Sequence, residues 1–288
     1  MAITIKKVLS NSKKILNEEL GSAYQKNNFD AEYCLMEVLK KDRIFLHSSD
    51  ETKISKHQLY QYNKLLKQRK SGRPLAQVLG WQNFFKNKFL VNRDVLIPRS
   101  ETEILIPKIL KKGDEIYDKN QSVTIIDAGA GTGCIGMSLA LERKNWKIYL
   151  VENSPKVIDI LLLNHKKFKL QNCKIICSNW LSSIENNVAD ILVSNPPYIN
   201  KLAGDVEESV AKFEPESALF ANDNGLSEIK KIIIESRRII KEKGLLFLEN
   251  GYNQSENIVS ILRKNYYKDI KTILDYNDIE RFTVSQHP

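Results

Sequence analysis

The chain has 288 residues, a net charge of +9 and a hydrophobic content of 42%. This length predicts about two domains, and the apolar content is sufficient for a sizeable core. No apolar run approaches the roughly 20 residues of a membrane span, and the N-terminus lacks the apolar core of a signal peptide, so the sequence excludes a membrane-spanning protein and predicts a soluble, cytoplasmic one.

The four cysteines, Cys34, Cys134, Cys173 and Cys177, are few and irregularly spaced. Cys173 and Cys177 lie four positions apart in a strand-like run with no second ligand pair. The sequence therefore predicts reduced cysteines and no metal site.

The positive charge is concentrated at the start of the chain. Residues 1–80 contain 15 Lys or Arg against 8 Asp or Glu, whereas residues 121–288 contain 21 of each. The excess is consistent with a surface that docks an acidic protein or an RNA, and equally with a solvated lysine face that has no partner.

The first part of the chain predicts helices. Apolar residues recur at helical spacing from Ile5 to Leu16 and from Ala31 to Leu39, with Asp30 as a plausible cap, and a third helix is expected over Ser55–Lys70. A break at residues 71–74 precedes an expected hairpin over residues 76–91, with its turn at Lys86-Asn87. We therefore divide the chain into a helical domain (1–72), a β-hairpin linker (73–100) and a catalytic domain (101–288).

The second part alternates strands with helices. Short apolar runs at 123–127, 147–152, 173–178, 189–195 and 244–250 predict strands, and 133–143, 155–169 and 225–241 predict helices. This alternation predicts a parallel sheet covered on both faces. Two further strands, near 269–274 and 281–285, are expected to end the sheet antiparallel. The stretch from Asn195 to Asn224 is long for a plain loop, which indicates a functional segment.

The first motif is Asp127-Ala128-Gly129-Ala130-Gly131-Thr132-Gly133, between a predicted strand and helix. Its glycines allow a tight turn and close approach of a ligand to the backbone. Asp127 would repel a phosphate but suits a cationic ligand, such as the ammonium and sulfonium groups of S-adenosylmethionine. Glu152 ends the next strand and could accept hydrogen bonds from two ribose hydroxyls. The alternatives are that the glycine motif is only a structural turn and that Glu152 is a solvated residue at the start of a helix.

Ser178-Asn179-Trp180 follows the next strand. In such folds this position lies beside the adenine, which predicts that Asn179 pairs with the adenine edge and that Trp180 packs nearby. The alternative for Trp180 is that its side chain packs in the hydrophobic core and does not contact the cofactor.

Asn195-Pro196-Pro197-Tyr198 follows the fourth strand, where ligands of open α/β sheets bind. The two prolines fix the backbone and leave rigid carbonyls. The Asn195 side-chain oxygen and the Pro196 carbonyl can accept both N–H bonds of a planar NH₂ group, on which Tyr198 can stack. The motif predicts nitrogen methylation.

An amide nitrogen is a poor nucleophile, and the motif contains no His or Cys to act as a base. We therefore expect catalysis by orientation, which recovers on the order of 7–11 kcal/mol of a barrier. Polarisation by the two acceptor oxygens adds an electrostatic contribution.

Nearly the whole chain resembles the HemK/PrmC family, the peptide chain release factor N5-glutamine methyltransferases. The resemblance is carried by Asp30-Ala31-Glu32, by residues 96–103 (LIPRSETE), by Asp127–Gly133, by Asn195–Tyr198 and by Phe213-Glu214-Pro215. It implies a Rossmann-like class I S-adenosylmethionine-dependent methyltransferase fold, with a mostly parallel seven-stranded sheet. It also implies, as acceptor, the glutamine of the Gly-Gly-Gln motif of bacterial release factors.

The resemblance also implies roles for single residues. Gly129, Gly131 and Gly133 would wrap the methionine part of the cofactor, with Asp127 and Ala130 in the same turn. Glu152 would hold the ribose and Asn179 the adenine, beside Trp180. Asn195, Pro196, Pro197 and Tyr198 would hold the glutamine amide. Arg99 and Glu101 either brace the site or form a local salt bridge that fixes the linker.

Some positions depart from the family pattern. Ala128 and Ala130 replace Leu and Thr, Asn179 replaces Asp, Ser100 replaces Pro, and Asn250 stands where His is frequent. None of these changes removes an atom that the proposed chemistry needs.

Three other functions remain open. Adenine-N6 methylation of DNA or RNA would use the same motif, although no target-recognition domain is evident and nucleic acid is not the expected substrate. Ser100 favours an enzyme acting on a ribosomal-protein glutamine, whereas Glu101-Thr102-Glu103 favours release factors. A cofactor-binding scaffold without activity would not need the intact Asn195–Tyr198 motif. We expect a monomer.

Overall fold

The computed structural model describes residues 3–25, 29–202 and 206–288. The chain forms two compact units: the first contains residues up to Gly80 together with Glu208–Phe213, and the second contains the remaining residues. Within the described ranges no helix has the length and apolar character to cross a membrane.

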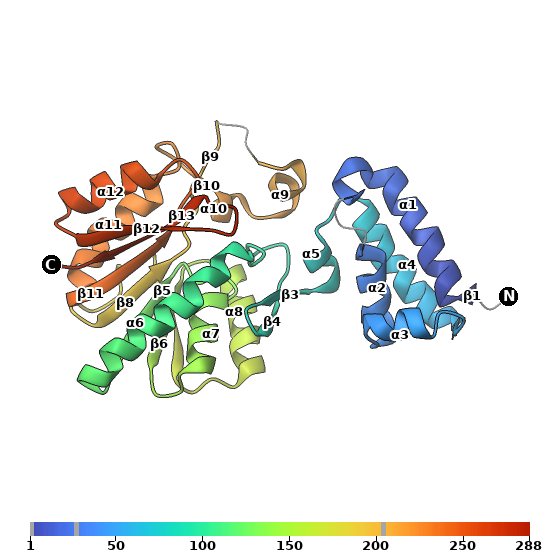
Figure 1. The fold of residues 1–288 in the computed structure, drawn as a ribbon, viewed down its shortest axis with the longest axis horizontal. Coiled ribbons are helices and arrows are strands. Elements are labelled where there is room, and N and C mark those ends of the chain that lie inside the picture. Colours follow the sequence, from blue (N-terminus) through green and yellow to red (C-terminus); the bar gives the residue numbers. More distant parts are fainter. Residues whose placement is uncertain (1–2, 26–28, 203–205) are drawn as a thin grey trace. The chain divides into compact units, whose positions relative to one another are not determined.

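The first unit is helical (Figure 1). Its two short strands, β1 (Ile3–Thr4) and β2 (Lys53–Ile54), pair antiparallel. The helices are α1 (Ile5–Gln25), interrupted at Gly21, α2 (Asp30–Leu39), α3 (Arg43–Ser48), α4 (Lys56–Lys70), α5 (Leu75–Leu79) and α9 (Glu208–Phe213). The apolar faces of α1 to α5 enclose a separate core that includes Leu16, Leu35 and Tyr62.

One of the expected helix starts in this unit is wrong and another is confirmed. Asp30 does not cap α2, since Phe29 is the N-cap residue and no side chain caps the helix. The buried Asp30 carboxylate instead accepts a hydrogen bond of 2.5 Å from Arg69 of α4. Helix α4 begins as the sequence predicts, because Ser55 and Gln58 form a reciprocal capping box.

The second unit contains a seven-stranded sheet with the order β12-β13-β11-β8-β5-β6-β7 (Figure 1). Strands β11, β8, β5, β6 and β7 are parallel, whereas β13 runs antiparallel to β11 and to β12. The strands are β5 (Thr124–Ala128), β6 (Lys147–Glu152), β7 (Cys173–Cys177), β8 (Ala189–Ser194), β11 (Ile240–Glu249), β12 (Lys268–Leu274) and β13 (Glu280–Gln286). The predicted Rossmann-like fold is confirmed.

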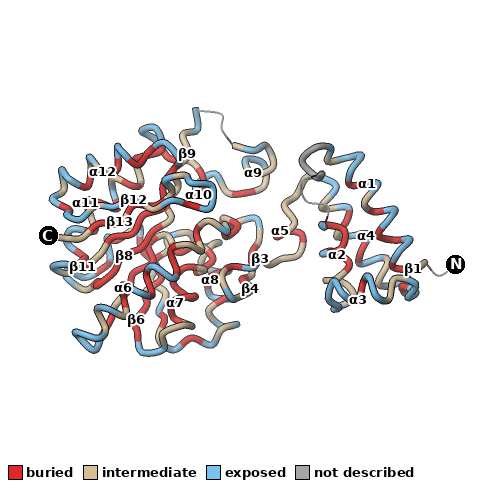
Figure 2. The backbone as a smooth tube through the Cα atoms, in the orientation of Figure 1, coloured by how far each residue is buried: buried red, intermediate tan, exposed pale blue. Residues whose placement is uncertain are grey.

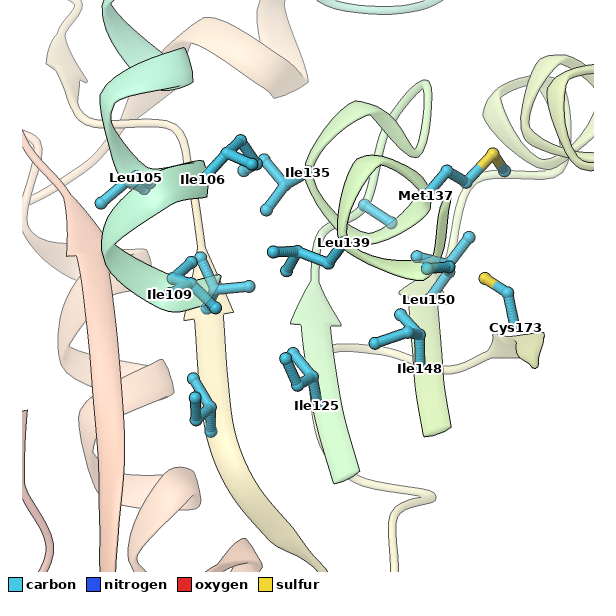
Figure 3. Close-up of a cluster of buried hydrophobic side chains, with 14 of the residues drawn as sticks. Leu105, Ile106, Ile109, Ile125, Ile135, Met137, Leu139, Ile148, Leu150 and Cys173 are labelled. Atoms are coloured by element: carbon cyan, nitrogen blue, oxygen red, sulfur yellow. The ribbon is translucent and has the colours of Figure 1, made fainter. Parts of the chain in front are cut away.

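Alternate residues of each central strand supply two cores, one on either face of the sheet. Ile125 of β5 belongs to the core under α6 (Leu105–Asn120) and α7 (Cys134–Glu142), where Ile109 and Leu139 point toward the strands (Figure 3). Ile126 belongs to the core under α11 (Ser227–Ile239) and α12 (Ser255–Lys264). Figure 2 shows β8 as a buried strand, which explains its unbroken apolar sequence.

A hairpin opens the second unit, but it is shorter than the predicted 76–91, because Leu75–Leu79 forms helix α5. Strands β3 (Trp81–Phe84) and β4 (Asn87–Leu90) pair with Phe84 opposite Asn87, so the turn is Phe85-Lys86 and the expected Lys86-Asn87 turn was one residue too late. Phe85 has φ +55°, the left-handed conformation that the turn requires. Phe84 and Phe89 enter the core below α6 and thereby anchor the hairpin to the sheet.

The expected long loop after β8 contains ordered elements. Residues 199–224 include a two-strand parallel pair, β9 (Ile199–Asn200) with β10 (Phe220–Ala221), and α10 (Glu216–Leu219), besides α9. Residues 203–205 of this segment lie outside the described residues. Helix α8 (Pro155–Phe168) and the 3₁₀ turn Glu101–Ile104 complete the unit.

Candidate active site

One cavity of about 410 Å³ lies beyond the carboxyl ends of β5, β6 and β8, a size typical of small-molecule sites. Its lining brings together most of the predicted site residues: Arg99, Asp127, Gly129, Ala130, Gly131, Glu152, Asn179, Trp180, Asn195 and Pro197. Among the described residues, Glu101, Gly133, Pro196 and Tyr198 are not part of that lining.

The three glycines of the turn have different surroundings. A side chain at Gly131 would meet no atom within 4 Å, so this glycine leaves space open where it lines the cavity. A side chain at Gly129 would come within 2.9 Å of the Trp180 ring. Gly133, with φ +80°, begins α7, and a Cβ there would collide with Leu161 and Met137. The left-handed backbone conformation, which favours glycine, explains this third glycine without a ligand.

Asp127 is a buried carboxylate at the end of β5. It accepts a hydrogen bond of 2.8 Å from the N–H of Gly136 and so ties the strand to the first turn of α7. Burial raises the pKa of Asp127 to about 7, and the nearby Glu152 charge adds to the rise. An incoming cation would stabilise the ionised form, which makes this position suitable for a positively charged group.

Glu152 ends β6 with its carboxylate beside the glycine turn. Its Oε2 accepts from the N–H of Gly131 at 3.1 Å, and its Oε1 accepts from the N–H groups of Asn153 and Ser154 at 2.9 and 3.1 Å. These contacts hold the carboxylate at the cavity wall, and a carboxylate has further acceptor capacity for the hydroxyls of a ligand.

Asn179 and Trp180 follow β7 and line the same cavity. The Trp180 indole N–H donates to Glu228 of α11 at 2.7 Å, which fixes the ring against Gly129. Glu228 also lines the cavity but was not recognised from the sequence, because it lies 48 residues further along the chain.

The segment after β8 is held from several sides. Ser194 Oγ donates to the Ala128 carbonyl at 2.7 Å, which joins the ends of β8 and β5. Gln254 Nε2 donates to the Tyr198 carbonyl at 2.8 Å, and Gly225 packs so closely that a Cβ would lie 2.0 Å from that oxygen. The Tyr198 ring packs against the core below α11, so its predicted stacking on a substrate stays a prediction.

Two polar residues next to Asn195 and Tyr198 were not predicted as site residues: Thr102, which lines the cavity, and Glu249, which is not part of the lining. Thr102 donates to Glu249 Oε2 at 2.6 Å and accepts from Asn195 Nδ2 at 3.4 Å, and Tyr198 donates to Glu249 Oε1 at 3.2 Å. Burial raises the pKa of Glu249 to about 7. An acid that ends a buried strand had already directed attention to Asp127 and Glu152, and the same signal was present at Glu249.

Arg99 donates to Glu214 at 2.7 Å, and the Ile97 N–H donates to the same buried carboxylate at 2.9 Å. The sequence had left open a local salt bridge that fixes the linker, but the partner of Arg99 is Glu214, 115 residues away, and Arg99 also lines the cavity. Glu101 accepts from the Ser100 hydroxyl at 3.1 Å.

The cavity wall contains no histidine among the residues that the structure describes. Cys134 lines it, but burial raises the pKa of this thiol to about 12, so it is protonated at neutral pH and unsuited to nucleophilic attack. The ionisable groups of the described lining also include the carboxylates of Asp127, Glu152 and Glu228, and catalysis by orientation stays a prediction.

Family models match both units. Residues 14–80 match the PrmC N-terminal domain, and residues 102–219 match the methyltransferase small domain. A crystal structure of a methyltransferase from Pyrococcus furiosus superposes with a TM-score of 0.51 at 14% identity, over 69% of this chain and 87% of that chain, which shows a shared fold. The second unit is a Rossmann-like methyltransferase domain.

Relatives of similar length show to which family of methyltransferases the chain belongs. The release factor glutamine methyltransferase of Buchnera aphidicola subsp. Baizongia pistaciae is 36% identical over 96% of this chain and 99% of its own length. That of Salmonella typhimurium is 34% identical over 88% of this chain and 90% of its own. The chain belongs to the family of release factor glutamine methyltransferases.

The buried Asp127 carboxylate predicts a stability effect. Because its pKa is raised to about 7, the native state is penalised as pH rises from about 4 to about 7, and the penalty is complete above that range. Asp127→Asn keeps an acceptor for Gly136 and removes the charge. We expect the variant to be more stable than the wild type at pH 8, by on the order of 2 kcal/mol, and to lose this advantage near pH 4.

Urea unfolding at several pH values measures this difference. Asp159→Asn changes an exposed aspartate of α8 and serves as the control, for which we expect no comparable gain. Equal stabilities of wild type and Asp127→Asn at pH 8 would contradict the proposed burial penalty.

Proposed function

We propose that this chain transfers the methyl group of S-adenosylmethionine to the side-chain amide nitrogen (N5) of the glutamine in the Gly-Gly-Gln motif of peptide chain release factors. One observation carries the proposal. In a member of this family, Asn195 and Pro197 share a single cavity with the Gly129–Gly131 turn and with Glu152. A site for a methyl donor and a site for a planar amide would thus adjoin.

The cavity fits the cofactor by its donor set. The space beside Gly131 would admit the methionine part, and the carboxylate of Asp127 lies at the same wall for its cationic groups. Glu152 would accept from the ribose hydroxyls, and Asn179 beside Trp180 would meet the adenine. When bound, the cofactor supplies an electrophilic methyl group and leaves as S-adenosylhomocysteine.

The acceptor amide would be held by Asn195 Oδ1 and the Pro196 carbonyl, which together accept both of its N–H bonds. These contacts would aim the nitrogen at the methyl group and polarise the amide as charge develops. The proton would leave to water after transfer, because the proposal assigns the carboxylates of Asp127 and Glu152 to the cofactor.

Cofactor binding predicts that filling the space at Gly131 abolishes it. Gly131 has φ +56° and Gly80 has φ +79°, and neither has an atom within 4 Å of an added Cβ. Gly131→Val and Gly80→Val therefore carry similar backbone strain, but Gly80 does not line the cavity. In calorimetry with S-adenosylmethionine, we expect saturable binding to wild type and Gly80→Val and none to Gly131→Val. Absence of binding to the wild type would overturn the cofactor assignment.

Acceptor positioning predicts that Asn195→Ala slows methyl transfer about 10²–10³-fold while cofactor affinity stays nearly unchanged, because Asn195 contacts the acceptor and not the donor. The measurement is single-turnover transfer of labelled methyl groups to a release factor. A release factor whose Gly-Gly-Gln glutamine is replaced by alanine should take up no label, nor should a ribosomal protein or adenine-containing DNA. An unchanged rate in Asn195→Ala would refute the assigned role.

The first unit is the candidate surface for choosing the substrate protein. The sequence suggested Lys64, Lys67, Arg69 and Lys70 of α4 as contacts with an acidic partner. Arg69 is not available, since its side chain is 15% exposed and bonds the buried Asp30, and Lys70 pairs with Glu19 at 2.6 Å. Lys64 and Lys67 are exposed, which leaves them as the candidates of this group.

Docking through these lysines predicts that the Lys64→Glu/Lys67→Glu variant lowers kcat/KM for the release factor about tenfold at low salt, and that the defect shrinks as salt rises. The control is Lys111→Glu/Lys174→Glu, which makes the same charge change at exposed positions of the second unit. A folded Lys64→Glu/Lys67→Glu variant with wild-type kcat/KM at low salt would leave the first unit a purely structural role.

A further inference from the structure

Glu249 lies behind the cavity and is linked to the two polar side chains of the Asn195–Tyr198 motif, those of Asn195 and Tyr198. It ends β11, is 1% exposed, and places one carboxylate oxygen on Thr102 and the other on Tyr198. Thr102 is equally buried, at 2% exposure, and contacts Asn195. The chain of contacts therefore runs from Glu249 through Thr102 to Asn195, and directly from Glu249 to Tyr198.

The hydrogen atoms of this chain have one consistent arrangement when Glu249 is ionised. A hydroxyl has a single proton to donate, and a carboxylate can only accept, so the Thr102 proton is committed to Glu249 at 2.6 Å. Thr102 then offers a lone pair to Asn195, and only the NH₂ end of the Asn195 amide can meet it, at 3.4 Å. The Asn195 oxygen is consequently turned away from Thr102.

We propose that Thr102 and Glu249 are positioning residues that fix which end of the Asn195 amide faces the acceptor. The inference rests on the proposed function, in which Asn195 Oδ1 accepts from the glutamine NH₂. A reversed amide would set its own NH₂ against the NH₂ of the acceptor, and two donors cannot bond each other. Correct orientation is therefore a condition for acceptor binding in a reactive geometry.

The surroundings of Glu249 supply further charges. Arg281 of β13 lowers the pKa of Glu249, whereas Glu101 raises it. The charge of Glu249 in turn raises the pKa of the Cys134 thiol. Arg281 is itself held by Asp275 at 3.2 Å. Thr102 stands between the carboxylate and Asn195, so altering its hydroxyl breaks the relay without removing a charged side chain. Because the hydrogen bond from Thr102 lowers the pKa of Glu249, loss of the hydroxyl also raises that pKa.

Thr102→Val replaces the hydroxyl with a methyl group of similar size, and Thr102→Ser retains it. We expect Thr102→Val to lower the single-turnover rate of methyl transfer about 10- to 100-fold, with cofactor affinity within about threefold of the wild type. Thr102→Ser should restore most of the rate. Ser236→Ala, which removes a buried hydroxyl bonded to Tyr267 in another part of the second unit, is the control for general loss of a buried hydrogen bond.

A double-mutant cycle with Asn195→Ala separates positioning from a structural role. If Thr102 acts through Asn195, then Asn195→Ala/Thr102→Val should be no slower than Asn195→Ala alone. A double variant slower by the full factor of Thr102→Val would overturn the inference, as would a folded Thr102→Val enzyme with the wild-type rate.

A measurement on the unaltered site covers the case in which Thr102→Val does not fold. The side-chain NH₂ resonances of Asn195, assigned by their loss in Asn195→Ala, should exchange with water on the order of tenfold more slowly than those of exposed Asn153. Equal exchange rates would refute an amide held by Thr102. This readout needs no methyl acceptor, so it fails or succeeds independently of the release-factor assay.

Discussion

The parallel alignment of β5, β6, β8 and β11 is the constraint on which the site depends. Parallel strands end at the same edge of a sheet, so residues that are distant in sequence meet there without any local signal that pairs them. Asp127, Glu152, Asn195 and Glu249 each stand at or directly after such an end. Short bonds between the strand ends, such as that from Ser194 to the Ala128 carbonyl, keep the four positions in a fixed relation.

The site places carboxylates where water is excluded. Burial raises the pKa of both Asp127 and Glu249 to about 7, so their ionised forms are destabilised in the folded protein. A core of apolar residues would be more stable. In the proposed function, Asp127 would provide a fixed acceptor for a cation, and Glu249 would fix the orientation of an amide. Stability is thus given up at positions where the chemistry requires preorganised polar groups.

The strands of the central sheet were predictable because both of their faces are buried, which leaves unbroken apolar runs such as Ala189–Ser194. Helices α6 and α12 were not recognised, although each has an apolar face with Ile109 or Ile258 in a core. Asp30 was misassigned as a cap because its burial against Arg69 involves a partner 39 residues away. Local chemistry at Ser55, by contrast, gave a helix start that the structure confirms.

The sequence alone determined the α/β class, the order of the strands along the chain and the motifs at Asp127–Gly133 and Asn195–Tyr198, because turns, prolines and apolar periodicity are local properties. The tertiary structure decided that Thr102 and Glu228 line the same cavity, that Glu249 and Glu214 bond to the lining residues Thr102 and Arg99, and that Gly133 has a left-handed backbone. These relations depend on the register of distant strands and on side-chain packing between them. Residue spacing within a single segment predicts neither the register nor the packing.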